Sequence, residues 1–169
     1  MEPKTIIQKL NDNQFVFKYL LENKSIEESI FRPDEHSWCL LEVACHLLDE
    51  EVEDFRARVN HILRTPNLSL KPIAPHKWPA ERNYLRKDFN GTVKSFLAER
   101  RKSVDWLSRL KRANWQQTVD HPEVGPRSAK KFLVNWLAHD YHHIRQINRI
   151  HHAYLKFTSG DDLTYAGKW

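Results

Sequence analysis

The segment from Ala129 to Leu155 constrains the fold of this chain most strongly, because no glycine or proline interrupts it. A run of this length without a helix breaker predicts one long helix. Ser128 stands just before it, where its side chain can accept a hydrogen bond from a backbone N–H that has no helical partner. Residues spaced by four and three positions form one stripe of this helix: Phe132, Trp136, His139, His143, Gln146 and Ile150.

Two histidines of this stripe, His139 and His143, stand one helical turn apart. At this spacing both imidazoles can point to one position, as they do where a helix supplies two zinc ligands. The pair alone does not establish a metal site, because histidines on helices also occur on the surface or as hydrogen-bonded core residues. A third nitrogen ligand from elsewhere would complete an open metal site.

A second helical pattern, from Trp38 to about Leu63, supplies a candidate for this third ligand. Its apolar face repeats every seven residues at Leu41, Leu48, Phe55 and Ile62. His46 falls on this face, one turn before Glu50. We therefore predict that His46, His139 and His143 together hold a divalent metal ion. Most acidic residues of this helix (Glu42, Asp49 and Glu53) are expected to face solvent, whereas Glu50 could reach the site and accept a proton.

Two further amphipathic segments run from Pro3 to Glu22 and from about Asn83 to Arg112. Residues 65–79 and 115–127 form long connections that contain several prolines. Four long amphipathic helices with long connections predict an all-α fold, a four-helix bundle. The chain has 169 residues and no internal repeat, so one domain over residues 1–169 is expected.

Composition argues against several classes of protein. No apolar run approaches the roughly 18 residues that a membrane span needs, and the start of the sequence lacks a signal-peptide core. Cys39 and Cys45 are predicted to lie on different faces of one helix, so neither a disulfide nor an oxidising compartment is expected, and the cytoplasm is the predicted location.

The net charge is +5, but the basic residues are spread out. We expect the densest basic cluster, residues 100–112, to be a solvated helix face and no nucleic acid to bind.

Three features of the connections and the C-terminal end have open roles. His76 and Trp78 could line the opening of a pocket, although packing of the loop over the end of the bundle explains Trp78 equally well. His121 belongs to a turn signal in the second connection. The aromatic tail, with Tyr165 and Trp169, is expected to dock on the bundle.

Three segments of the chain resemble those of the DinB/YfiT-like superfamily. They are W-C-L-L-E-V-A-C-H-L-L-D-E-E from Trp38, H-D-Y-H-H-I-R-Q-I from His139, and the Y-A-G-K-W end. The resemblance implies a four-helix bundle with a three-histidine divalent metal site, commonly zinc or nickel, and frequent homodimers. It maps the ligands to His46, His139 and His143, and not to His142. Cys39 departs from the pattern, which usually has Ser or Thr there as a helix N-cap; Ser37 is a possible substitute.

The resemblance also implies a choice of activities. Members of the superfamily include transferases that join low-molecular-weight thiols such as bacillithiol to electrophiles. A small-molecule substrate, with Glu50 or His142 moving protons, is the corresponding prediction here. Metal-dependent hydrolysis of an ester or amide would use the same ligands, and a non-catalytic metal-binding or small-molecule-binding bundle is a third alternative. In a fourth, the histidines bind no metal and are core residues.

Overall fold

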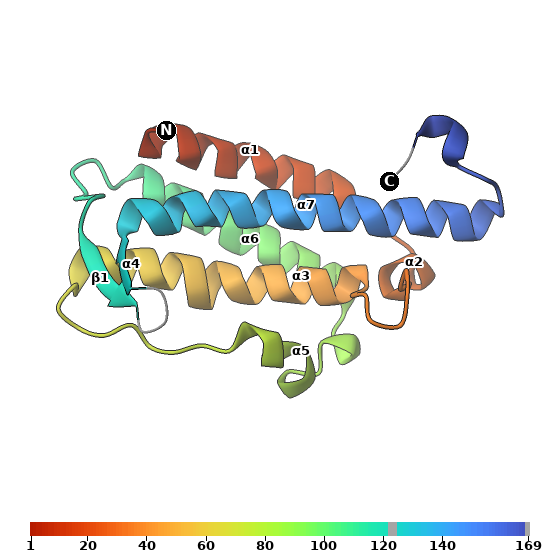
Figure 1. Cartoon of the computed structure of the whole chain (residues 1–169), viewed down its shortest axis with the longest axis horizontal. Helices are drawn as coiled ribbons and strands as arrows, with labels where there is room; N and C mark the ends of the chain where they lie inside the picture. Colours follow the sequence, from red (N-terminus) through yellow and green to blue (C-terminus); the bar gives the residue numbers. More distant parts are fainter. Residues whose placement is uncertain (122–124, 168–169) are drawn as a thin grey trace.

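Four long helical segments lie side by side in the computed structural model, which describes residues 1–121 and 125–167 (Figure 1). They are α1 (Pro3–Leu21), a composite segment, α6 (Phe89–Ser108) and α7 (Ala129–Ser159). The composite segment consists of α3 (Leu40–Asp49), the π-helix η1 (Glu50–Phe55) and α4 (Arg56–Arg64). The predicted all-α four-helix bundle is confirmed.

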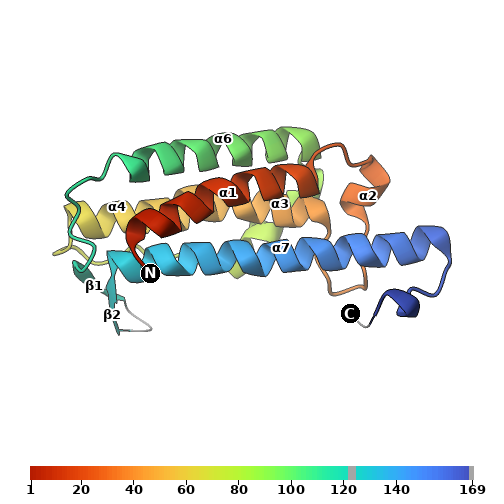
Figure 2. The same cartoon turned by 90° about the horizontal axis from the view of Figure 1, so that it is seen from above.

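The order of the helices around the bundle differs from their order in the sequence. α1 packs against α6 and α7, while α3 packs against α6 and α4 packs against α7. α1 and α7 run in one direction, and the α3–α4 segment and α6 run in the other (Figures 1 and 2). Because α6 is parallel to the α3–α4 segment, the chain must return along the bundle between them. This return explains the long connection at 65–88, which holds α5 (Trp78–Glu81) and the 3₁₀-helices η2 (Pro75–Lys77) and η3 (Tyr84–Arg86).

The ends of α7 follow from local chemistry. The Ser128 hydroxyl accepts a hydrogen bond from the Lys131 N–H at 3.1 Å, which is the predicted N-cap. The helix ends at Gly160, whose φ of 70° lies in the left-handed region that glycine adopts without strain. One uninterrupted helix therefore runs slightly beyond the predicted end at Leu155.

The third predicted helix, from Asn83 to Arg112, is too long at both ends. Asn83 has a left-handed backbone with φ of 50°, and a 3₁₀-turn follows it. α6 begins only after Asp88, whose carboxylate accepts a hydrogen bond from the Gly91 N–H at 2.6 Å. The connection after α6 contains a hairpin that the prediction missed, with β1 (Thr118–His121) antiparallel to β2 (Gly125–Ser128). Pro122, part of the predicted turn signal, lies outside the described residues.

The start of α3 shows how the Cys39 N-cap is supported. Glu42 accepts a hydrogen bond from the Cys39 backbone N–H at 3.0 Å and pairs with Arg32 at 2.8 Å. Glu42 is therefore buried, which corrects the expectation that it faces solvent. Ser37 does not substitute as the cap, because its hydroxyl donates to Asp34. The short helix α2 (Ile26–Ile30) precedes this turn.

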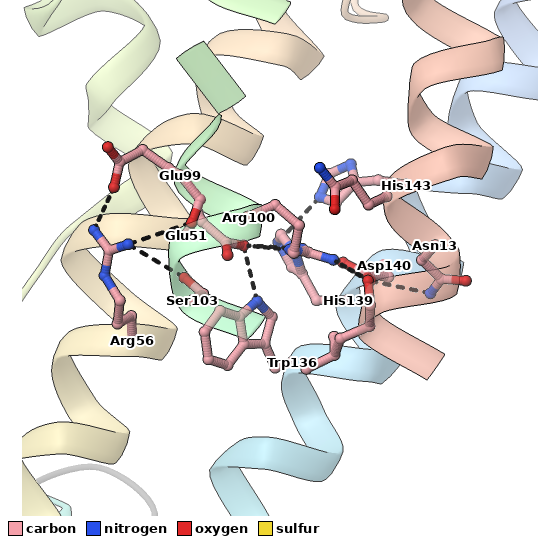
Figure 3. Close-up of polar contacts among 12 residues, drawn as sticks. Asn13, Glu51, Arg56, Glu99, Arg100, Ser103, Trp136, His139, Asp140 and His143 are labelled. Carbon is pink, nitrogen blue, oxygen red and sulfur yellow. Dashed lines mark hydrogen bonds and ion pairs between the residues drawn. The ribbon is translucent and has the colours of Figure 1, made fainter. Parts of the chain in front are cut away.

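A buried ionic network crosses the bundle (Figure 3). Arg100 of α6 is 1% exposed and donates to Asp140 of α7 at 2.6 and 2.7 Å, and to Glu51 of η1 at 2.9 Å. Asn13 of α1 also donates to Asp140, and the indole N–H of Trp136 donates to Glu51. The expectation of a solvated basic face is therefore wrong at Arg100. Arg100 can be buried because two buried carboxylates compensate the charge of its guanidinium.

The residues predicted at the periphery of the bundle are partly buried and partly exposed. Trp78 is buried in the core, and His76 is exposed. The tail prediction is wrong for Tyr165, whose side chain is fully exposed beside the 3₁₀-helix η4 (Thr164–Ala166), and Trp169 lies outside the described residues. Cys39 and Cys45 are free thiols, as expected. Among the described residues, no helix is long and apolar enough to cross a bilayer.

Candidate metal centre

The structure brings His46 of α3 together with His139 and His143 of α7. The Nε2 atom of His139 lies 3.2 Å from that of His46 and 3.1 Å from that of His143. The ligand atoms of all three side chains lie within 4.8 Å of one another. At a usual metal–nitrogen distance of about 2.1 Å, contacts of this length correspond to angles of roughly 95–100° at a shared ion. The donor set therefore fits a divalent metal ion on geometric grounds.

Hydrogen bonding of the imidazoles leads to the same conclusion. The Gln146 side-chain oxygen lies 2.7 Å from His143 Nδ1 and, as an acceptor, requires the proton on that nitrogen. His143 Nε2 is then an acceptor in the neutral ring. His139 Nε2 can carry at most one hydrogen, and it can donate this hydrogen to only one of the two neighbouring Nε2 atoms. Without a cation, the two short contacts of His139 could therefore not both be hydrogen bonds donated by its Nε2. A cation bound by all three lone pairs satisfies this cluster better than one hydrogen does.

Burial keeps these imidazoles neutral. Removal from water, together with the neighbouring imidazoles, lowers the pKa of His46 to about 3 and that of His139 to about 2. Burial also lowers the pKa of His143 to about 4, against the opposing effect of its hydrogen bond to Gln146. Neutral imidazole is the form that binds metal, so the site needs no deprotonation near pH 7.

The π-helix η1 shapes the wall beside the triad. A π-turn holds one residue more than an α-turn, so it displaces the residues that follow it by about 100° around the helix axis. Phe55 consequently faces the same side as His46, and its ring centroid lies 5.0 Å from that of His139. π-Turns occur frequently at functional sites. This π-turn could not be predicted from the sequence, because an extra residue leaves the apolar pattern of the helix nearly unchanged.

Glu50, at the start of η1, lies in the cavity wall and is 5% exposed. Burial, with the nearby Asp54 carboxylate, raises the pKa of Glu50 well above its usual range. Asp54 is in turn paired with Arg58. The Glu50 carboxyl therefore keeps its proton near neutral pH and is better suited to donate a proton than to accept one.

The triad lines an open cavity of about 670 Å³. His142 also lines it, from an exposed position next to His143, so the structure places both candidate proton-moving residues at the cavity. His76 and His121 are not among its lining residues. Sequence reasoning did not assign the other residues of the wall to the site: Pro33, His36, Ser37, Trp38, Asp54, Phe55, Arg149 and Ile150. Some of them had a signal in the sequence: Ile150 belongs to the stripe of His139 and His143, Phe55 lies on the apolar face with His46, and Arg149 stands two turns after His142.

The cysteines do not form a second reactive site. Burial raises the pKa of the Cys45 thiol to about 11 and also raises that of Cys39. Neither residue lines the cavity of the triad. A thiol held in its protonated form is a weak nucleophile.

Comparisons with known proteins agree with the geometry. The sequence pattern of the DinB superfamily matches residues 9–147. The structure is similar to that of YfiT from Bacillus subtilis, described as a probable metal-dependent hydrolase with an unusual four-helix bundle topology. The TM-score is 0.79 at 17% sequence identity, over 95% of this chain and 89% of YfiT. No curated protein matches the sequence. The extent of the sequence match shows that the chain belongs to the DinB superfamily.

Proposed function

We propose that this protein is a metal-dependent enzyme that joins a low-molecular-weight thiol to a small electrophile. The convergence of three imidazole nitrogens beside an open cavity carries the proposal. The three ligands line the cavity, so a small molecule in the cavity could approach a metal ion that they hold. A bound divalent metal ion, zinc or nickel, would hold the thiol as its thiolate.

The residues around the triad have separate tasks in this proposal. Gln146 fixes the proton of His143 on Nδ1 and so keeps Nε2 free as a ligand. Glu50 holds a proton at the cavity wall and donates it where the group that leaves the electrophile is basic, such as an alkoxide; chloride leaves without it. His142, exposed at the cavity, passes the proton of the incoming thiol to solvent.

Hydrolysis of an ester or amide is the second candidate function. The description of YfiT favours it, although a likeness at 17% identity extends to the fold alone. Glu50, whose carboxyl keeps its proton near neutral pH, is poorly suited to take a proton from water, but His142 could take it as it takes the proton of a thiol. We place thiol transfer first because of the sequence resemblance to the thiol transferases of the superfamily.

Activity assays on the metal-loaded protein separate these functions. Protein reconstituted with Zn²⁺ or Ni²⁺ is incubated with a chloronitrobenzene electrophile and a panel of low-molecular-weight thiols, and separately with a nitrophenyl ester without thiol. We expect thiol-dependent conjugation that His143→Ala lowers at least 100-fold, because loss of a ligand should cost more than the roughly 10- to 100-fold loss that follows removal of a ligand's hydrogen-bond partner. His76→Ala, an exposed histidine away from the cavity, serves as the control. Ester turnover without thiol would support hydrolysis, and no turnover by metal-loaded protein would contradict both enzymatic functions.

A further inference from the structure

Arg149 of α7 lines the cavity of the triad but has no role in the proposed reaction. It is exposed, and it makes no hydrogen bond or ion pair within residues 1–121 and 125–167. Arginine is well suited to bind carboxylate or phosphate groups, because its planar guanidinium presents several donors in a fixed arrangement. Within the described residues the Arg149 guanidinium therefore has no partner, which leaves it able to bind a ligand in the cavity.

The helical register places Arg149 at a definite distance from the metal ligands. It follows His143 by six residues, which corresponds to a rise of about 9 Å along α7. It also follows His142 by seven residues, so both side chains lie on the same side of the helix. Arg149 thus lies further along the cavity than the triad and cannot itself be part of the metal site.

The acidic groups near Arg149 do not neutralise it by contact. The Asp34 carboxylate is close enough to feel the charge of Arg149, but it accepts hydrogen bonds from the Ser37 hydroxyl at 2.6 Å and the His36 N–H at 3.0 Å. Of the acidic residues that line the cavity, Glu50 keeps its proton and Asp54 is paired with Arg58. The cavity therefore favours a negatively charged ligand near Arg149.

Apolar side chains form other parts of the wall. Trp38 lies beside His46 with a ring-centroid distance of 5.1 Å, Phe55 faces His139, and Ile150 is buried next to Arg149. These surfaces favour a ligand with an apolar body. Such a ligand would have its reacting group at the triad and its charge at Arg149.

We propose that Arg149 binds an anionic group of the substrate, so that the substrate is a small acid with an apolar body. This inference rests on the proposed function, since it assumes that the reacting group is held at the triad. The anionic group is a carboxylate or another oxyanion, held beyond the triad in the direction of the C-terminal end of α7, where Arg149 follows His143 by an axial rise of about 9 Å.

Binding of a matched pair of thiols tests this assignment. 6-Mercaptohexanoate and 6-mercaptohexanol differ in charge but have similar length. Isothermal titration of Zn-loaded protein with each compound measures the preference for the acid. We expect the wild type to bind the acid about tenfold more tightly than the alcohol, the size of one charge-assisted contact. Arg149→Gln should remove the preference and leave the affinity for the alcohol unchanged.

Arg145→Gln is the matched control, because Arg145 is also exposed on α7 but does not line the cavity. It should keep the tenfold preference. Equal binding of the two thiols by the wild type, or equal loss of preference in both variants, would overturn the role of Arg149. Zn-loaded protein that binds neither thiol would contradict the proposed thiol transfer itself, and with it the proposed role of Arg149.

Discussion

At the scale of single residues, Gln146 decides which nitrogen of His143 faces the metal position. Its side-chain oxygen accepts the Nδ1 proton at 2.7 Å and thereby orients the imidazole. His46 has no such support among the described residues, since its buried Nδ1 lacks a hydrogen-bond partner there. The support at His143 is therefore expected to contribute measurably to metal affinity.

Gln146→Leu should weaken metal binding about 10- to 100-fold, because the substitution removes this hydrogen bond and keeps a similar side-chain volume. Competition with a chelator of known affinity measures the change. Gln146→Glu retains an acceptor at the same position and should restore most of the affinity. An unchanged affinity in the leucine variant would show that Gln146 does not orient the ligand.

The buried histidines also predict how the metal-free protein responds to pH. Their pKa values, about 2 to 4 when folded, lie below the value of about 6.5 in the unfolded chain. Below pH 6.5 the unfolded chain therefore binds more protons, and stability falls as the pH falls. Each histidine contributes about 1.4 kcal/mol per pH unit.

Denaturant unfolding of chelator-treated protein at pH 7 and pH 5 measures this loss. His139→Ala should reduce the loss by about 2 kcal/mol, because it removes one of the three titrating groups. His76→Ala, at an exposed position, should leave the loss unchanged. The same loss in the His139→Ala variant as in the wild type would contradict the assignment.

Single residues also show what sequence can and cannot reveal. The spacing of His139 and His143 identified the pair, because a helix fixes the relation between residues four apart. Arg100 could not be identified in this way. Its burial depends on Glu51 and Asp140, which are 49 and 40 residues away in the sequence. Among several arginines and lysines of similar spacing, only the folded structure distinguishes the one with buried partners.

At the scale of elements, the Arg100 network joins all four long helical segments. Asn13, Glu51, Arg100 and Asp140 come from α1, η1, α6 and α7 respectively (Figure 3). Asp140 directly follows His139 in α7, so the network also fixes the helix beside the histidine triad. Loss of its central cation would leave two carboxylates buried without a counter-ion.

Arg100→Met should accordingly destabilise the protein by about 3–5 kcal/mol. Chemical denaturation followed by circular dichroism measures the free energy of unfolding. The neighbouring Arg101→Met removes the same charge from an exposed position and should change stability by less than about 0.5 kcal/mol. Similar losses in the two variants would mean that the network does not hold the helices together.

The elements also differ in how well the sequence predicted them. α1 and α7 have proline, serine and glycine signals at their ends, and the predicted and observed bounds agree closely. The beginning of α6 was missed because a left-handed Asn83 and a 3₁₀-turn preserve the helical spacing of apolar residues. The β1–β2 hairpin was missed because strands of four residues are too short for alternation to be distinguished from loop sequence.

At the scale of the whole molecule, α7 packs along the composite segment and contacts α3, η1 and α4. The contacts with α3 and η1 join the elements that hold His46 and Glu50 to the helix that holds His139 and His143. Helical periodicity predicted the number of long segments but not their order around the bundle, since amphipathic faces do not specify partners. The homodimer and the cytoplasmic location remain predictions.

The most direct test of the account is the metal content of tag-free protein by elemental analysis. Wild type reconstituted with Zn²⁺ or Ni²⁺ is compared with His139→Ala and with His142→Ala, which removes the adjacent exposed imidazole outside the triad. We predict about one ion per chain in the wild type and in His142→Ala, and a loss of most of it in His139→Ala. Wild type that stays empty after reconstitution, or equal metal content in all three proteins, would contradict the three-histidine metal centre.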